Sequence, residues 1–289
     1  MQFGGIRPSK TIFSSSESII LKSSTGRQAT AITVPGLCIL LFCRVPYEEF
    51  KYPAYETPLL DAYDRRFEAA FVMLHPFVRV PQHLSWNTIA SYPEDAQILS
   101  QGQKCTWAEI YTQTGLNSCA KLNQALLASI GSIKEELADF EARNVLQGFL
   151  ESEPIWMPTE GRFEPLLHMD LLAAFEAAHL NKLTFVPEFP HLEVAAEIEI
   201  SQLKSRALPF PSRGTLMPAD RSFLFTVDWD SFFTLFYGPR KFVTDVASQR
   251  NLEGFFAYPK MEHFWFNYSM GCATVTISPE HWPPICADA

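Results

Sequence analysis

Residues 221–267 constrain the fold of this chain most, because runs of large apolar residues alternate there with short turn-forming segments. Residues 223–227 and 232–237 have the aromatic and β-branched composition of strands. Between them lies Asp228-Trp229-Asp230-Ser231, which is typical of a turn because Asp side chains hydrogen-bond to their own backbone. The pattern predicts two strands joined by a tight connection.

The rest of this segment predicts a helix and two more strands. Gly238-Pro239 is a suitable helix start, and the helix would carry Phe242, Val243 and Val246 on its apolar face. Residues 252–258 and 264–268 again have strand composition. The expected order is therefore β-β-α-β-β.

Helical spacing dominates the chain before residue 205. Apolar residues at Leu60, Tyr63, Phe67, Phe71 and Leu74 follow steps of three and four, which predicts an amphipathic helix over 59–74. Further helices are expected over 133–149 and 164–180, whereas residues 191–204 fit neither a helix nor a strand.

A pair of short helices is predicted between residues 106 and 131. Thr106 and Glu109 have the spacing of a capping box, and Gly115 is a natural left-handed helix end. A second helix would begin near Ser118 and end at Gly131. The order of capping residues therefore indicates two helices joined by a short turn.

Separate helical and strand regions predict an α+β protein, with a mostly helical N-terminal part packed on the C-terminal antiparallel unit. We expect a flexible Ser-rich leader at 1–30, a mainly helical part at 31–204, and the sheet unit with one helix and an irregular tail at 205–289. Residues 37–43 are expected as a buried strand, because this apolar run is too short and too late for a signal peptide or membrane span.

Composition narrows the possible functions. The 289 residues are 47% apolar and carry a net charge of −9, so they suit a globular protein that repels phosphate backbones. Six cysteines without a Cys-x-x-Cys pair indicate free thiols in a reducing compartment. We therefore expect a cytoplasmic protein that binds neither nucleic acid nor a membrane.

Three residues are candidates for catalysis. If Asp228, Asp230 and His263 converged, two carboxylates and an imidazole could activate water as in a hydrolase. The alternative is structural, because Asp228 and Asp230 are also ordinary turn residues and their spacing matches no specific metal motif. We predict neither a metal site nor a cofactor.

Ligand binding has its own candidates. Arg213 lies in a loop where it could bind an anion, and Trp229 and Trp265 are aromatic residues expected at the surface. The helix pair at 106–127 also resembles a helix-turn-helix, with Lys121, Asn123 and Gln124 on its second helix. Without a flanking basic cluster, ordinary helix packing is favoured over a DNA-binding regulator.

Six strings stand out along the chain: PYEEFKYPAYETPLL, FVMLHPFVRV, TWAEIYTQTGL, ALLASIGSIKEE, DRSFLFTVDWDSFFTLFYG and LEGFF. They resemble a family of uncharacterised bacterial proteins, found in bacilli and their relatives and classed only as a domain of unknown function. The resemblance covers about residues 45–267, and it implies a bacterial cytoplasmic protein without naming a cofactor or a catalytic residue.

These observations favour a non-enzymatic binding protein over an enzyme. No nucleophile motif such as Gly-x-Ser-x-Gly is present, while the chain is acidic and rich in aromatic residues. Toxin-neutralising immunity proteins share this composition, so another protein is the expected partner. The hydrolase and the DNA-binding regulator remain alternatives.

Overall fold

The computed structural model describes residues 18–22, 28–34, 37–41, 50–89, 91–189 and 195–264. The chain divides into two compact units, Met1–Tyr47 and Glu48–Ala289. The first contains an antiparallel sheet in the order β1-β2-β3, so the strand expected at 37–43 is found over Leu37–Leu41, and part of the predicted leader is in strands. Residues 42–43 and the expected burial of this strand lie outside what the structure describes. These strands are β1 (Ser18–Lys22), β2 (Gln28–Val34) and β3 (Leu37–Leu41).

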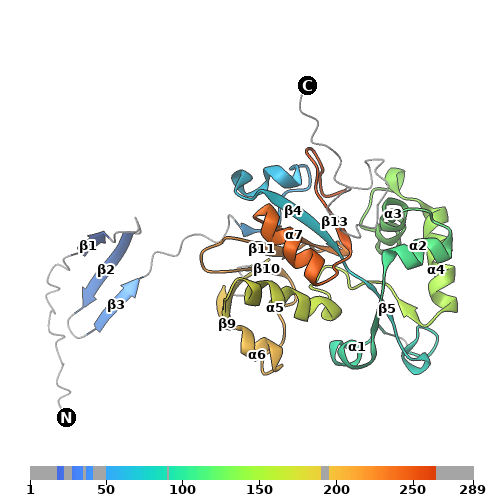
Figure 1. Ribbon diagram of the computed structural model, residues 1–289, viewed down its shortest axis with the longest axis horizontal. Helices are drawn as coiled ribbons and strands as arrows, with labels where there is room; N and C mark the ends of the chain where they lie inside the picture. The colour runs from blue at the N-terminus through green and yellow to red at the C-terminus, as the bar shows by residue number, and fades with distance from the viewer. Residues whose placement is uncertain are drawn as a thin grey trace, which may run out of the picture. The chain divides into compact units, whose positions relative to one another are not determined.

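A seven-stranded antiparallel sheet organises the described part of the second unit, in the order β13-β4-β12-β11-β10-β8-β9 (Figure 1). Its strands come from both sides of residue 204, so the helical and strand-rich regions share one core. The strands are β4 (Ala69–Leu74), β8 (Lys182–Pro187), β9 (Ala196–Glu199), β10 (Gly214–Met217), β11 (Leu224–Val227), β12 (Phe233–Gly238) and β13 (Gly254–Phe256).

The α+β class is confirmed, and so is most of the predicted β-β-α-β-β order. β11 and β12 form an antiparallel pair, α7 (Arg240–Gln249) follows Pro239, and β13 lies within the third predicted strand. The fourth strand is not found at Phe264, and the remainder of that prediction, 265–268, lies outside the described residues.

The helix predicted over 59–74 is wrong. Residues Leu59–Arg65 form only a kinked 3-10 segment, in which Ala62 and Tyr63 leave the helical region of backbone angles. Residues Ala69–Leu74 form β4, which lies between β12 and β13. All six β4 residues are buried, so apolar side chains stand at every position of the strand. Their spacing therefore cannot distinguish a strand from a helix.

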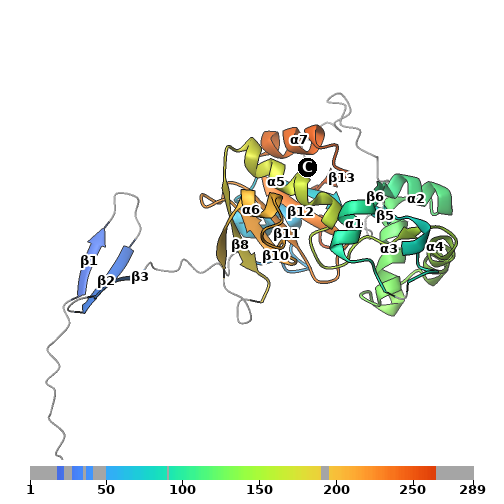
Figure 2. The ribbon, with the colours of Figure 1, turned by 90° about the horizontal axis from the view of Figure 1, so that it is seen from below.

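Three helices cover one face of the large sheet. α5 (His168–Ala177), α6 (Ile200–Lys204) and α7 pack there against an apolar core (Figure 2). Phenylalanine rings supply much of this core, including the stacked pair Phe225 and Phe236 at 4.3 Å. Burial of such large rings is a main source of stability for the unit.

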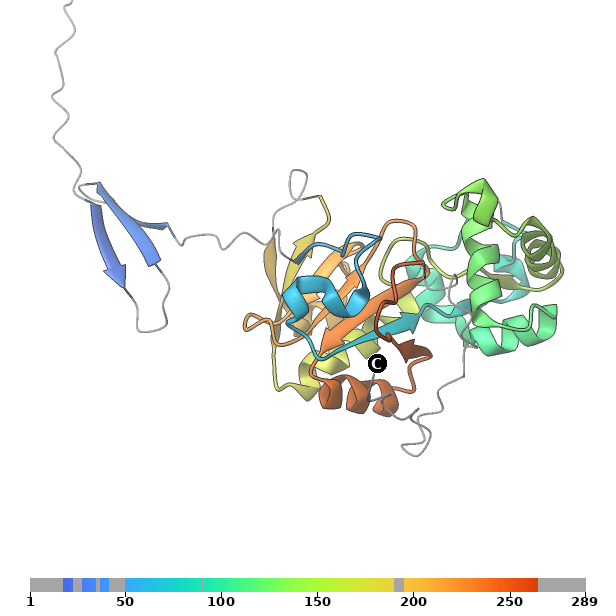
Figure 3. The ribbon, with the colours of Figure 1, turned by 90° about the horizontal axis from the view of Figure 1, so that it is seen from above.

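The opposite face is covered by irregular chain. Residues 50–67, blue to cyan in Figure 3, lie over the strands, and Tyr63 and Phe67 contact Tyr237 of β12. Residues 257–264 complete this layer, because Leu59 N–H donates to Met261 O and Ala257 N–H donates to Ala70 O. The large sheet is therefore packed by helices on one side and by loops on the other.

A helical lobe extends from the end of β4. The capping box of Thr106 and Glu109 and the left-handed Gly115 confirm the first helix of the predicted pair, and Ser118 caps the second. None of the helices within the described residues is long and apolar enough to cross a membrane. The lobe comprises β5 (Phe77–Arg79), α1 (Asp95–Gln101), β6 (Gln103–Cys105), α2 (Trp107–Thr114), α3 (Cys119–Ile130), α4 (Phe140–Ser152) and β7 (Ile155–Trp156).

Candidate functional site

The candidate site lies where β11 turns into β12. The predicted turn is present, and the Ser231 hydroxyl donates to the carbonyl oxygens of Asp228 and Phe233. Asp228 is buried and Asp230 is partly exposed, whereas Trp229 is 51% exposed. The turn therefore presents an indole ring at the surface and keeps one carboxylate beneath it.

A loop from the helical lobe passes close to this turn at Gly161. The Gly161 N–H donates to Ser231 O, and the backbone has a φ of 62°. A Cβ at this position would collide with the carbonyl oxygen of Trp229, so only glycine allows this approach. The approach brings Glu160 to the same edge of the sheet.

Arg213 connects these segments. Its Nε–H donates to Gly161 O at 2.6 Å and lies 3.4 Å from Oε2 of Glu188, just after β8. The guanidinium carbon is 3.9 Å from the centroid of the Trp229 ring, a cation–π contact. Two of the predicted ligand-binding residues, Arg213 and Trp229, thus lie in contact, whereas Trp265 lies outside the described residues.

Carboxyl groups gather around this contact. The pKa of Glu160 is raised by burial and by the charge of Asp230, and the pKa of Asp230 is raised by burial and by Asp228. Burial also raises the pKa of Glu188, with Asp228 and Asp230 adding to it and Arg213 opposing it. Burial and the charges of neighbouring acids therefore disfavour the charged forms of Glu160, Glu188 and Asp230 around one arginine.

Asp228 belongs also to a buried cluster beneath the turn. Tyr55 Oη donates to Asp228 Oδ2 at 2.6 Å, and the Tyr55 ring stacks on His263 at 4.3 Å. His263 Nδ1 shares a hydrogen bond of 2.8 Å with Tyr52 Oη, and its Nε2 lies 3.9 Å from Asp228 Oδ2. The structure thus brings Asp228 and His263 together, with Asp230 at the surface above them.

This cluster is poorly arranged for the hydrolase alternative. The His263 and Asp228 side chains are only 3% and 9% exposed, and burial lowers the pKa of His263 to about 4 although Asp228 opposes the shift. A separation of 3.9 Å is also too long for a hydrogen bond. Among the described residues, no group of three His, Cys, Asp or Glu could hold a metal ion.

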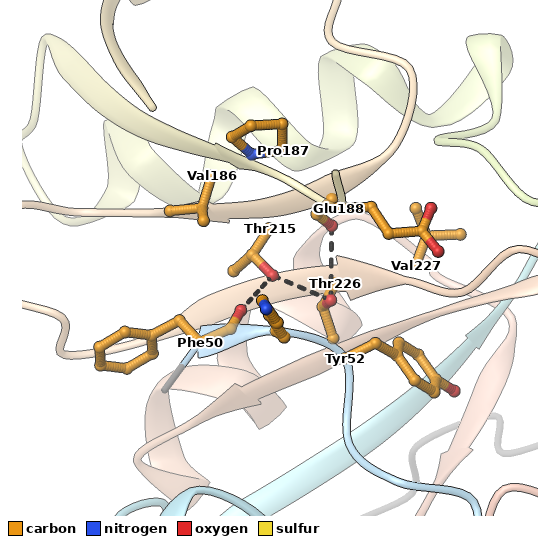
Figure 4. Close-up of a pocket in the computed structure, with 10 residues that line it drawn as sticks. Phe50, Tyr52, Val186, Pro187, Glu188, Thr215, Thr226 and Val227 are labelled. Atoms are coloured by element: carbon orange, nitrogen blue, oxygen red, sulfur yellow. Dashed lines mark hydrogen bonds between the residues drawn. The ribbon is translucent and has the colours of Figure 1, made fainter. Parts of the chain in front are cut away.

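A recess lies beside the cluster, between residues 50–52 and strands β8, β10 and β11 (Figure 4). Thr215 Oγ1 donates to Phe50 O and to Thr226 Oγ1 across its floor, and Glu188 lies at its rim. The space inside it that a water molecule can reach is about 10 Å³, which is room for about one water molecule and far too little for an organic ligand. Recognition at this edge would therefore use surface contacts.

The helix pair at 106–127 offers little for reading a DNA groove. Asn123 is 1% exposed, and the Gln124 side chain donates to Leu137 O. Lys121 is paired with Asp139 at 3.3 Å. Asn123 is therefore buried, while Gln124 and the half-exposed Lys121 each have a partner within the lobe.

Five residues of the site were missed from the sequence: Tyr52, Tyr55, Glu160, Gly161 and Glu188. Tyr52 and Tyr55 stand in a proline-rich segment that the sequence indicates only as an extended connector with aromatic anchors. For Glu160 and Gly161 no local pattern signals a site, because their role comes from a turn about 70 residues later in the chain. Glu188 follows a strand that was not predicted.

The comparisons with known proteins agree with the predicted resemblance. The family model described as "Protein of unknown function (DUF2711)" matches residues 55–267. The uncharacterised protein YwbB of Bacillus subtilis (strain 168) is 22% identical over 207 residues, which cover 68% of this chain and 90% of that protein. No solved structure matches. The matched range includes both the turn and the acids around it, and the chain belongs to the DUF2711 family of proteins of unknown function.

Proposed function

We propose that this protein is a non-enzymatic binding protein, and that it recognises a positively charged segment of another protein. The contact surface is the aromatic–acidic patch, formed by Glu160, Glu188, Phe189, Trp229 and Asp230. Phe189 and Trp229 are 38% and 51% exposed, and their rings meet edge to face at 6.2 Å. Exposed aromatic residues of this kind commonly anchor protein interfaces.

The single observation that carries this proposal is the excess of carboxyl groups over cations around an exposed indole, where three acids of the patch share one arginine, Arg213. Burial and, secondly, the charges of neighbouring acids raise the pKa of Glu160, Glu188 and Asp230, and Arg213 offsets only part of this increase. A basic partner would relieve the repulsion between these acids and also contact the rings. The net charge of −9 would assist the encounter.

Binding of a short peptide tests the proposal. The probe is a Gly-Ser peptide with interspersed arginines and lysines, and its control has glutamine at the same positions. We expect salt-sensitive binding of the basic peptide by fluorescence anisotropy, and no binding of the control. The double variant Glu160→Gln/Asp230→Asn should weaken binding by about tenfold or more, because it removes rim charges.

A matched variant separates the patch from total charge. The variant Glu197→Gln/Glu199→Gln removes the same number of acids. Both glutamates lie on the edge strand β9, where they pair with Lys182 of β8. Binding should be unchanged in this control. The patch variant should also gain stability, by about 0.5 kcal/mol after solvent screening, whereas the control should lose a little. Equal loss of binding in both variants would contradict the proposal.

A further inference from the structure

We infer that the group which the aromatic–acidic patch recognises is an arginine side chain of the partner, in preference to lysine. The inference rests on the proposed function and names the chemistry that the patch selects. Its basis is the environment of Trp229, which already holds one guanidinium group of the protein itself.

Arg213 shows how a guanidinium fits this surface. Its planar group lies over the indole ring at 3.9 Å, while its Nε–H donates to a carbonyl oxygen and faces the Glu188 carboxylate. Trp229 is 51% exposed even with Arg213 in place. The remaining indole surface can therefore receive a second planar cation.

The acids next to this surface suit the same group. Asp230 is adjacent to Trp229 in the chain, and Glu160 precedes the glycine that contacts the Trp229 backbone. Both carboxyls lie within electrostatic reach of each other. A guanidinium can stack on the ring and donate two parallel hydrogen bonds to a carboxylate, whereas an ammonium is a compact, strongly hydrated charge.

The recess contributes no competing explanation for selectivity. It is lined by Tyr52, Glu188 and the threonines of β10 and β11, and it has room for only about one water molecule. Discrimination between two cations must therefore come from the geometry of the exposed ring and its carboxylates.

The experiment compares three Gly-Ser peptides that differ only in the interspersed residue: arginine, lysine or citrulline. Citrulline retains the planar shape of arginine but has no charge. We expect the arginine peptide to bind about tenfold more tightly than the lysine peptide, and the citrulline peptide to bind least. Fluorescence anisotropy at fixed ionic strength measures all three.

Two tryptophan variants locate the preference. Trp229→Leu should abolish the difference between arginine and lysine while leaving weak, salt-sensitive binding of both. Trp86→Leu is the matched control, because Trp86 is similarly exposed at 49% but packs on Trp156 in another part of the molecule. This control should keep the full preference.

The possible failures are distinguishable. Equal binding of the arginine and lysine peptides to the unmodified protein would overturn this inference and leave the proposed function standing. Tighter binding of the arginine peptide than of the lysine peptide by Trp229→Leu would also overturn it, since another part of the protein would then recognise arginine. Failure of both cationic peptides to bind would overturn the proposed function as well.

Discussion

The two faces of the large sheet are built from neighbouring residues of the same strands, yet they differ in chemistry. Phe236 faces the helices and stacks on Phe225 in an apolar core. Its neighbour Tyr237 faces the irregular layer, where Tyr63 and Phe67 surround it. The helix-covered face is packed mainly by apolar side chains, with the buried hydrogen bond between His75 and Thr234 at its border. The other face buries the hydroxyl, imidazole and carboxylate groups of Tyr52, His263 and Asp228.

This difference indicates a division of roles. Burial of aromatic rings stabilises a fold in proportion to the area removed from water. Burial of polar groups stabilises little and costs free energy wherever a hydrogen bond is missing. The irregular layer leads directly to the candidate site, through Asp228, Tyr55 and His263. We therefore attribute stability chiefly to the helix-covered face and recognition to the edge of the other.

The largest effect should come from truncation of a ring on the helix-covered face. Phe236→Ala should lower the free energy of unfolding by about 4 kcal/mol, because it leaves a cavity among residues that are fully buried. Chemical denaturation followed by circular dichroism measures the loss. Trp229→Ala, which truncates a half-exposed ring, should lose far less. Similar losses in both would refute the assignment of stability to the helix-covered face.

The second effect is a loss of stability at acidic pH, which depends on the buried His263 of the polar face. The pKa of His263 is lowered from 6.5 to about 4, chiefly by burial. The unfolded chain therefore binds this proton first as the pH falls from about 6.5 to 4, and stability is lost over that window. The two pKa values, 6.5 unfolded and about 4 folded, correspond to about 3 kcal/mol of stability, which is fully present above pH 6.5 and lost by about pH 4.

The variant His263→Phe should flatten part of this pH dependence. His75 and His168 also have a pKa of about 4, so they should retain their own share of the acid sensitivity. Burial raises the pKa of Glu164 and Glu253, and these groups act in the opposite direction because the folded state takes up their protons first. An unchanged slope in His263→Phe would mean that the imidazole is protonated normally in the folded protein.

Local signals in the sequence predicted much of this architecture. The helix pair followed from Thr106, Glu109 and Gly115, because capping depends on residues within a few positions of one another. The β11–β12 pair followed in the same way from Asp228 to Ser231 between two apolar runs. By contrast, β4 is an internal strand whose hydrogen-bonded partners β12 and β13 lie more than 150 residues away in the chain.

The candidate site could be predicted only in part, for the same reason. Arg213, Trp229, Asp228 and His263 were recognisable as polar or aromatic residues in suitable segments, but their contacts are set by distant parts of the chain. Arg213 reaches Trp229 because the loop at Gly161 holds both segments together. Contacts between irregular loops that are distant in the chain produce no hydrophobic periodicity, so the sequence does not indicate them.

The smallest effect is also the sharpest test of the two faces. Within the described part of the chain, the Tyr237 hydroxyl is buried without a hydrogen-bond partner, and the residue is 1% exposed. Tyr237→Phe should therefore raise the free energy of unfolding by about 0.5–1 kcal/mol, because it removes an unsatisfied polar group and keeps the ring.

Tyr52→Phe is the matched control on the same face, since it deletes a hydroxyl that is hydrogen-bonded to His263 at 2.8 Å. This change should lower stability by about 1 kcal/mol. Opposite signs for the two substitutions in urea denaturation would show that the polar face contains both satisfied and unsatisfied groups. A loss of stability in Tyr237→Phe would instead mean that its hydroxyl has a partner, and the faces would then differ less than their packing indicates.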